Sequence, residues 1–158
     1  MQFYGYSGIN IHAGVNSDVD KVFNKSEVVA TRFGRVDTYC CAKYIGNNAS
    51  GNDLSGFSGK MYELAFRHRH GPPLGFGAML VVYPLLITEG ISGELAEFIK
   101  QFSPKHFGAA EFASVLDLST NYLYYNPKTP VWGSAYFASY RKDVFRFYSP
   151  LAWKEFKR

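Results

Sequence analysis

The longest apolar run in the chain, residues 78–87, reads Ala-Met-Leu-Val-Val-Tyr-Pro-Leu-Leu-Ile and carries no charge. A helix that crosses a bilayer needs about 20 apolar residues, so this run is too short to span one. Its length, its β-branched content and the glycines before it favour a buried strand. Because odd and even positions are both apolar, we expect cover on both faces. Pro84 cannot donate to a ladder, which predicts a bulge, a bend or a second half at a sheet edge.

Length and composition indicate one folded unit. The 158 residues fit a single domain, residues 1–158, and the 47% hydrophobic content is too high for a disordered chain. Aromatic residues make up 18% of the chain, which is its most unusual property. Tyr and Trp are common where one side of the ring is apolar and the other wet, including protein interfaces. The composition therefore favours an aromatic core with tyrosines at its margins.

The first half reads mainly as β structure. A helix is predicted to begin at Ser17 and to fade near Asn24, and residues 27–33 and 36–45 are predicted to form a hairpin. Residues 46–60 hold four Gly, three Asn and three Ser, which predicts a disordered or mobile loop. Residues 60–70 fit either a strand or a helix, and the strand is preferred.

The second half alternates helices and strands. Ser92 is predicted to cap a helix over 92–102, and residues 111–125 are predicted to form a hairpin with Asn121 at positive φ in its loop. A last helix over 132–148 should stop at Pro150, before a basic tail over 150–158. This order predicts an α+β fold: a single domain with a mostly antiparallel sheet and two or three helices packed mainly on one face.

Histidines and carboxylates are the first candidates for chemistry. His68 and His70, two apart on a strand, could share a metal with His106, His12, Glu63 or Glu111. Arg67 and Arg69 beside them would repel a cation, so no metal and no cofactor is predicted. One alternative function follows from this region, a small hydrolase with or without a metal. Its candidate catalytic residues are His68, His70, His106, Glu111 and Asp117.

Cys40 and Cys41 are the only cysteines, and they are adjacent. On a strand their side chains point to opposite faces, so a disulfide between them is geometrically poor. Free thiols fit a reducing compartment, and the N-terminus shows no signal-peptide pattern, so a cytoplasmic protein is predicted. Nothing in the spacing supports a catalytic cysteine, and a small buried thiol is the default interpretation.

The C-terminal segment is basic. Residues 141–158 hold six Lys or Arg and two Asp or Glu, a net of +4 that equals the formal charge of the whole chain. The aromatic residues among them could stack on bases, so nucleic-acid binding by this helix is a second alternative. Basic residues near a helix C-terminus also complement the helix dipole, which is the simpler explanation.

The leading hypothesis is a non-catalytic binding or regulatory protein of the cytosol that acts through an aromatic-rich surface. Its expected partner is another protein or a second copy of the chain, and no membrane association is predicted. The absence of a convincing catalytic set in the sequence supports it. The residues predicted to bind are Tyr122, Tyr124, Tyr125, Trp132, Arg141 and Arg146.

Overall fold

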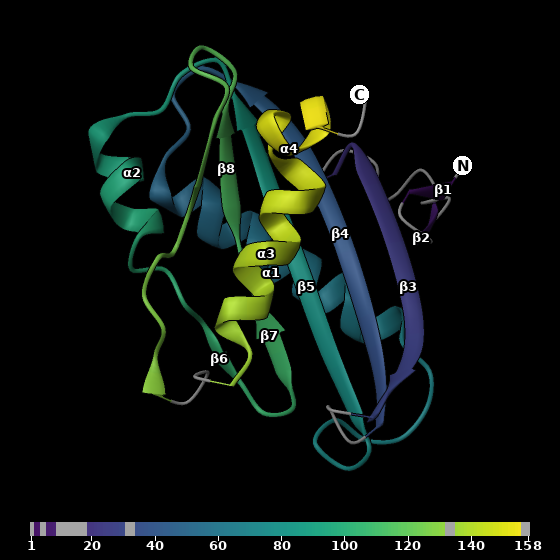
Figure 1. Ribbon diagram of the computed structural model, residues 1–158. Coiled ribbons are helices and arrows are strands. Elements are labelled where there is room, and N and C mark those ends of the chain that lie inside the picture. Colours follow the sequence, from purple (N-terminus) through teal and green to yellow (C-terminus); the bar gives the residue numbers. More distant parts are fainter. Residues whose placement is uncertain (1, 4–5, 9–18, 31–33, 132–134, 156–158) are drawn as a thin grey trace.

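The computed structural model describes residues 2–3, 6–8, 19–30, 34–131 and 135–155, and the fold is built from nine strands and four helices within them (Figure 1). The strands are β1 (Gln2–Phe3), β2 (Tyr6–Gly8), β3 (Lys21–Val29), β4 (Gly34–Gly46), β5 (Ala78–Thr88), β6 (Lys105–His106), β7 (Ala109–Glu111), β8 (Ser114–Asp117) and β9 (Tyr122–Tyr125). The helices are α1 (Gly51–His68), α2 (Gly93–Ile99), α3 (Phe137–Tyr148) and α4 (Pro150–Glu155).

One sheet joins all nine strands, and its pairing is mixed. Its main path runs β1-β2-β3-β4-β5-β7-β6, while β8 pairs with β5 and with β9. β5 is parallel to β4, β7 and β8, and the remaining pairs are antiparallel. The predicted mostly antiparallel sheet is therefore wrong. Parallel neighbours need a long crossover connection, usually a helix. The segment that supplies it is predicted from the sequence as a loop followed by a strand.

Helices cover both faces of the sheet, which corrects the expectation that they pack mainly on one face (Figure 1). On one face, Leu54 and Met61 of α1 and Leu95 of α2 join a buried cluster with the sheet. On the other face, Tyr140 and Val144 of α3 belong to a second buried cluster. β5 contributes to both clusters, because its even and odd residues point in opposite directions. Its apolar run at every position is the sequence signal for this arrangement.

The segment between β4 and β5 folds as helix α1, so the predicted mobile loop over 46–60 and the predicted strand over 60–70 are both wrong. Ser50 caps the helix: its Oγ accepts from the Asp53 N–H, and Asp53 in turn accepts from the Ser50 N–H. The buried positions Leu54, Phe57, Met61 and Leu64 follow helical spacing. Gly51 gives room for the ring of Phe98, since a Cβ there would lie 2.8 Å from Phe98 Cγ.

β5 confirms the prediction of a buried strand over 78–87, and Pro84 does not bend it. β5 pairs with β4 along its length, and on its other side with β7 through Leu80–Val82 and with β8 through Leu85–Thr88. Val82 O accepts from Phe112 N–H and Thr88 O from Leu118 N–H, so even-numbered residues direct their backbone groups to that side. Pro84, which has no N–H, falls between the two paired stretches. The interruption lies in the neighbouring strands.

Of the strands and helices predicted along the chain, some are confirmed and others are wrong. The helix predicted from Ser17 is wrong, because Lys21–Val29 pairs with β4 as an antiparallel strand. The hairpin predicted over 27–33 and 36–45 is confirmed as β3 and β4, with longer arms. The hairpin predicted over 111–125 is confirmed in part as β8 and β9, with a first arm that begins at Ser114, and Asn121 has φ 55°.

Two helix predictions hold in part. Ser92 caps α2, whose Leu95 N–H donates to its Oγ, but the helix ends at Ile99. In the described residues, the last long helix starts at Phe137, and Pro150 opens the short helix α4 where a basic tail was predicted. No helix in the described ranges is both long and apolar enough to cross a membrane.

Candidate functional site

A buried carboxylate lies between α1 and the sheet, and two side chains share it. Glu111 on β7 is only 5% exposed. Ser58 Oγ, on α1, donates to Glu111 Oε2 at 2.5 Å, and His106 Nε2, on β6, lies 2.5 Å from Glu111 Oε1. The β6–β7 hairpin pairs His106 with Ala109, which brings the imidazole beside the carboxylate two residues further on. Both carboxylate oxygens are thus engaged by the protein itself.

Tyr62 covers this cluster from α1. Its ring stacks on the His106 imidazole with centroids 3.9 Å apart and planes 14° apart. Burial, followed by the nearby charge of Glu111, raises the pKa of the Tyr62 phenol. Tyr62 lies one helical turn after Ser58, so a single face of α1 supplies both the hydroxyl and the covering ring.

The order of these groups does not match nucleophilic catalysis. A serine nucleophile is activated by a histidine that stands between it and an acid, whereas here the carboxylate stands between Ser58 and His106. Ser58 is fully buried. Three cavities, of about 200, 380 and 620 Å³, are lined by residues of α1, α2 and nearby strands and loops, and none of them is lined by the cluster. The arrangement satisfies buried polar groups and stabilises the packing of α1 on the sheet.

The structure brings His106 and Glu111 together, but the other predicted catalytic residues make their hydrogen bonds elsewhere. His68 is exposed at the end of α1, where its Nδ1 is 2.9 Å from Leu64 O, and His70 is exposed just beyond the helix. His12 lies outside the described residues. Within the described ranges, no three or more His, Cys, Asp or Glu side chains are grouped as metal ligands.

Asp117 lies at the far end of β8 and holds a turn. Its carboxylate accepts from the Ser119 N–H and from the hydroxyls of Ser119 and Thr120. Burial raises the pKa of Asp117, but these hydrogen bonds outweigh it and the net pKa is lowered. The charged form is therefore favoured, as expected of a carboxylate that closes a turn.

Cys40 and Cys41 point to opposite faces of the sheet and are free and buried, as predicted from their adjacency. Burial raises the pKa of the Cys40 thiol to about 12 and the pKa of Cys41 well above its ordinary value. A cysteine nucleophile acts as the thiolate, and both groups stay protonated near neutral pH. Their environment is that of small apolar side chains in the core.

The predicted tyrosine surface is only partly available. Tyr122 is exposed and meets Tyr124 edge to face at 4.7 Å, while Tyr124 and Tyr125 are half-buried. Tyr125 packs near Phe112 in the core beneath α3. Trp132, which was expected to extend this surface, lies outside the described residues.

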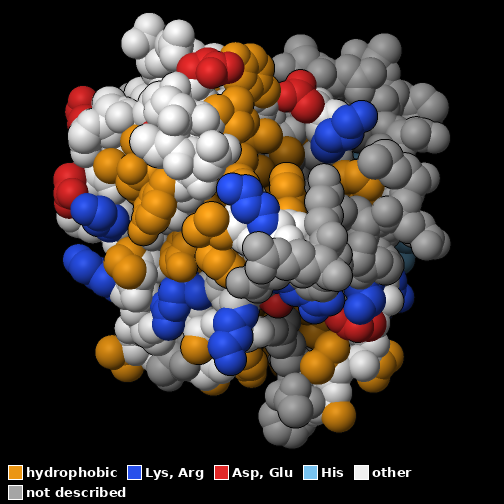
Figure 2. All heavy atoms as spheres, turned by 45° about the horizontal axis from the view of Figure 1, so that its top comes forward, with side chains coloured by type: hydrophobic (Ala, Val, Ile, Leu, Met, Phe, Trp, Pro, Cys, Tyr) orange, Lys and Arg blue, Asp and Glu red, His pale blue; other side chains and the backbone are white. Residues whose placement is uncertain are grey.

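The two predicted basic residues of the last helix, Arg141 and Arg146, differ in their surroundings. Arg141 donates to Thr129 Oγ1 and to Lys128 O, so it holds the preceding segment against α3. Arg146 is exposed near the end of α3. On the face seen in Figure 2, Lys and Arg side chains are scattered among hydrophobic and neutral ones. Nucleic-acid binding by phosphate contacts would favour a basic stripe, which this visible face does not display.

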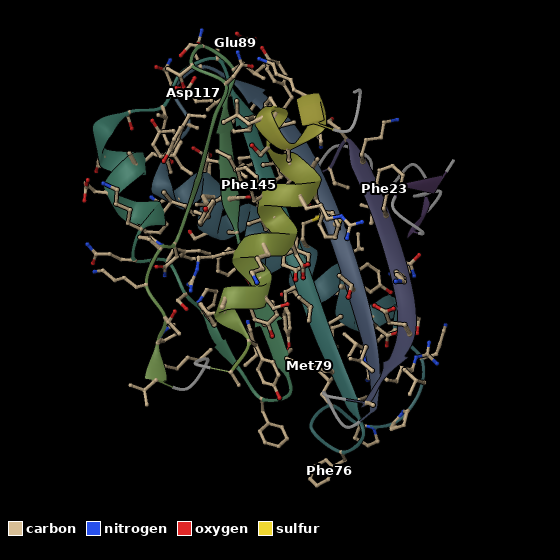
Figure 3. The ribbon with its side chains drawn as sticks, viewed as in Figure 1. Phe23, Phe76, Met79, Glu89, Asp117 and Phe145 are labelled. Carbon is tan, nitrogen blue, oxygen red and sulfur yellow. The ribbon has the colours of Figure 1, made fainter. Side chains whose placement is uncertain are left out.

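Two phenylalanines that were not predicted as a site lie at the end of the sheet where the parallel strands β5 and β7 begin. Phe76 lies in the loop between α1 and β5, and Phe107 lies in the turn between β6 and β7. They are 72% and 73% exposed, and their ring centroids are 6.0 Å apart. Figure 3 shows Phe76 projecting beyond the lower end of the sheet. We call these two rings the Phe76–Phe107 surface.

The backbone beneath these rings is closely packed. Gly108 has φ 66°, and a Cβ on it would lie 2.3 Å from the Gly75 nitrogen. A Cβ on Gly75 would lie 2.3 Å from Phe107 Cε1, so the Phe107 ring rests on that glycine. The Gly75 N–H also donates to Ala78 O. Glycines beside each phenylalanine are therefore required for the two loops to meet, and they are the sequence signal that could have marked this surface.

Two basic side chains belong to the segments that carry the Phe76–Phe107 surface. Lys105 is exposed two residues before Phe107, and Arg69 is half-buried with its guanidinium donating to Pro72 O in the same loop as Phe76. Arg67, in the last turn of α1, pairs instead with Glu63 at 3.4 Å. Exposed aromatic rings and positively charged side chains therefore occur on the same two segments.

Comparison of the chain with protein-family models, with curated proteins and with solved structures gave no match. The functional assignment therefore rests on the side chains described above.

Proposed function

We propose that this protein is a non-catalytic binding protein and that its contact surface is the Phe76–Phe107 surface. The observation that carries the proposal is the pair of rings, supplied by two separate loops, in contact with each other and nearly three-quarters exposed. Single exposed apolar side chains are ordinary, but paired large rings held outward on fixed loops favour burial against a partner.

The interior supports a binding role over an enzymatic one. Both carboxylate oxygens of Glu111, one of the predicted catalytic residues, are engaged by Ser58 and His106, and Glu111 lines none of the three cavities. A general acid or base must reach the proton it transfers, directly or through one water. A hydrolase that used this cluster would have to open the contact between α1 and the sheet first.

The energy available from the two rings suits a reversible contact. Fully burying one phenylalanine contributes roughly 1.5–3 kcal/mol, so two rings supply roughly 3–6 kcal/mol before the cost of association. The loops are held together by close backbone contacts, so little conformational entropy is lost on binding. Such a surface gives weak binding alone and firmer binding with neighbouring polar contacts or with a multivalent partner.

Site-specific photo-crosslinking tests this proposal. A benzophenone amino acid replaces Phe76 or Phe107 in turn, and Val131, which is 94% exposed, provides the control position. We expect adducts in cell extract at positions 76 and 107, several-fold above those at 131. The mass of the adduct distinguishes another protein, a second copy of the chain and a lipid. Equal labelling at the three positions would contradict a dedicated surface.

A further inference from the structure

The outward position of both rings of the Phe76–Phe107 surface bears on the kind of partner that fits them. Both rings stand on the tips of turns, and Phe76 projects beyond the ribbon in Figure 3. A protein partner could bury two projecting rings only with a cavity of matching shape. The interfacial layer of a bilayer deforms around apolar side chains and needs no such match.

Charge complementarity points in the same direction. Lys105 is exposed two residues before Phe107, and Arg69 is fixed against the Phe76 loop by its hydrogen bond to Pro72 O. Lys and Arg beside an apolar insertion are attracted to anionic headgroups, and the attraction falls off within a Debye length. Two exposed phenylalanines whose segments carry Lys105 and Arg69 therefore match an anionic lipid surface.

Resting on the proposed function, we infer that the partner of the Phe76–Phe107 surface is a membrane surface rich in anionic lipid. The two rings enter the headgroup region while Lys105 remains among the headgroups. The contact is peripheral. Membrane association is not predicted from the sequence pattern, because both rings lie in loops.

Vesicle co-sedimentation of the full chain tests the inference. One set of vesicles is pure phosphatidylcholine, and the other contains about 30% phosphatidylserine, a content at which anionic headgroups give a negative surface potential. We expect binding to the anionic vesicles, at least tenfold weaker binding to the neutral ones, and a decline in binding as salt rises. Binding of F76S/F107S to anionic vesicles should fall about tenfold or more, and K105A should bind several-fold more weakly than the unchanged protein.

Matched controls separate insertion from general adhesion. The V131S/L151S variant removes two exposed apolar side chains elsewhere and should bind as the unchanged protein does. Circular dichroism of each variant confirms that it is folded. If the unchanged protein ignores anionic vesicles, or if F76S/F107S binds them equally well, the inference is overturned. A protein adduct at positions 76 and 107 together with absent vesicle binding would overturn it too and leave the proposed binding function standing.

Discussion

Replacing either Val81 or Val82 by aspartate is expected to prevent the chain from folding, although the two side chains lie on opposite faces of β5. Both are fully buried, Val81 in the cluster beneath α3 and Val82 in the cluster beneath α1. A carboxyl group buried without a partner costs several kcal/mol in either ionisation state, and the lost valine burial adds to it. Whole-domain stability is only about 5–15 kcal/mol, so each substitution removes most of it.

Circular dichroism and urea unfolding of the two variants measure this effect. The matched control is Val28→Asp, because Val28 lies on the neighbouring strand β3 and is 83% exposed. It should keep the unfolding midpoint nearly unchanged. A helix layer on one face alone would leave one of the two valines tolerant of aspartate. A well-folded V81D or V82D protein would therefore disprove that helices cover both faces of the sheet.

Replacing Glu111 by alanine is expected to lower the free energy of unfolding by about 2–4 kcal/mol. The substitution removes the acceptor shared by Ser58 and His106, and each buried polar group left without a partner costs about 1–3 kcal/mol. The control is Glu97→Ala, which removes an exposed ion pair with Lys100 and should change stability by less than about 1 kcal/mol.

A double-mutant cycle between Ser58→Ala and Glu111→Ala shows whether the cluster stabilises the fold as argued. Groups in one hydrogen-bond network couple by about 0.5–3 kcal/mol, whereas independent sites add. Urea unfolding of both single variants and the double variant gives the coupling. Additive effects, or a Glu111→Ala variant as stable as the unchanged protein, would show that the contact contributes nothing to stability.

The parts of the fold that were predicted correctly have local signals. The run at 78–87 is apolar at every position, Ser92 precedes a helical apolar pattern, and Asn121 suits a turn at positive φ. Helix α1 was missed because glycine, asparagine and serine outweighed the spacing of its apolar residues. Of its three glycines, Gly51 leaves room for the Phe98 ring, whereas a Cβ on Gly56 or Gly59 would meet nothing within 4 Å. Once α1 was assigned to a loop, the parallel pairing of β4 and β5 could not be foreseen.

The candidate sites were harder to predict from the sequence than the strands and helices. His106 and Glu111 were both named as candidates, but their contact depends on a hairpin only a few residues long. Ser58, the third member, lay in the segment predicted to be mobile. Phe76 and Phe107 come together from loops 31 residues apart, and a sequence pattern does not show which loop residues remain exposed. The predicted site at Tyr122, Tyr124, Tyr125 and Trp132 stays a prediction.

The rings of Phe76 and Phe107 are available for a partner because the fold does not need them. The free energy of unfolding of F76S/F107S, without any partner or vesicle, tests this claim directly. Because most of each ring already faces water, the account predicts a change of less than about 1 kcal/mol from the unchanged protein. A loss of about 3 kcal/mol or more, the range for a buried aromatic, would show that the rings belong to the core.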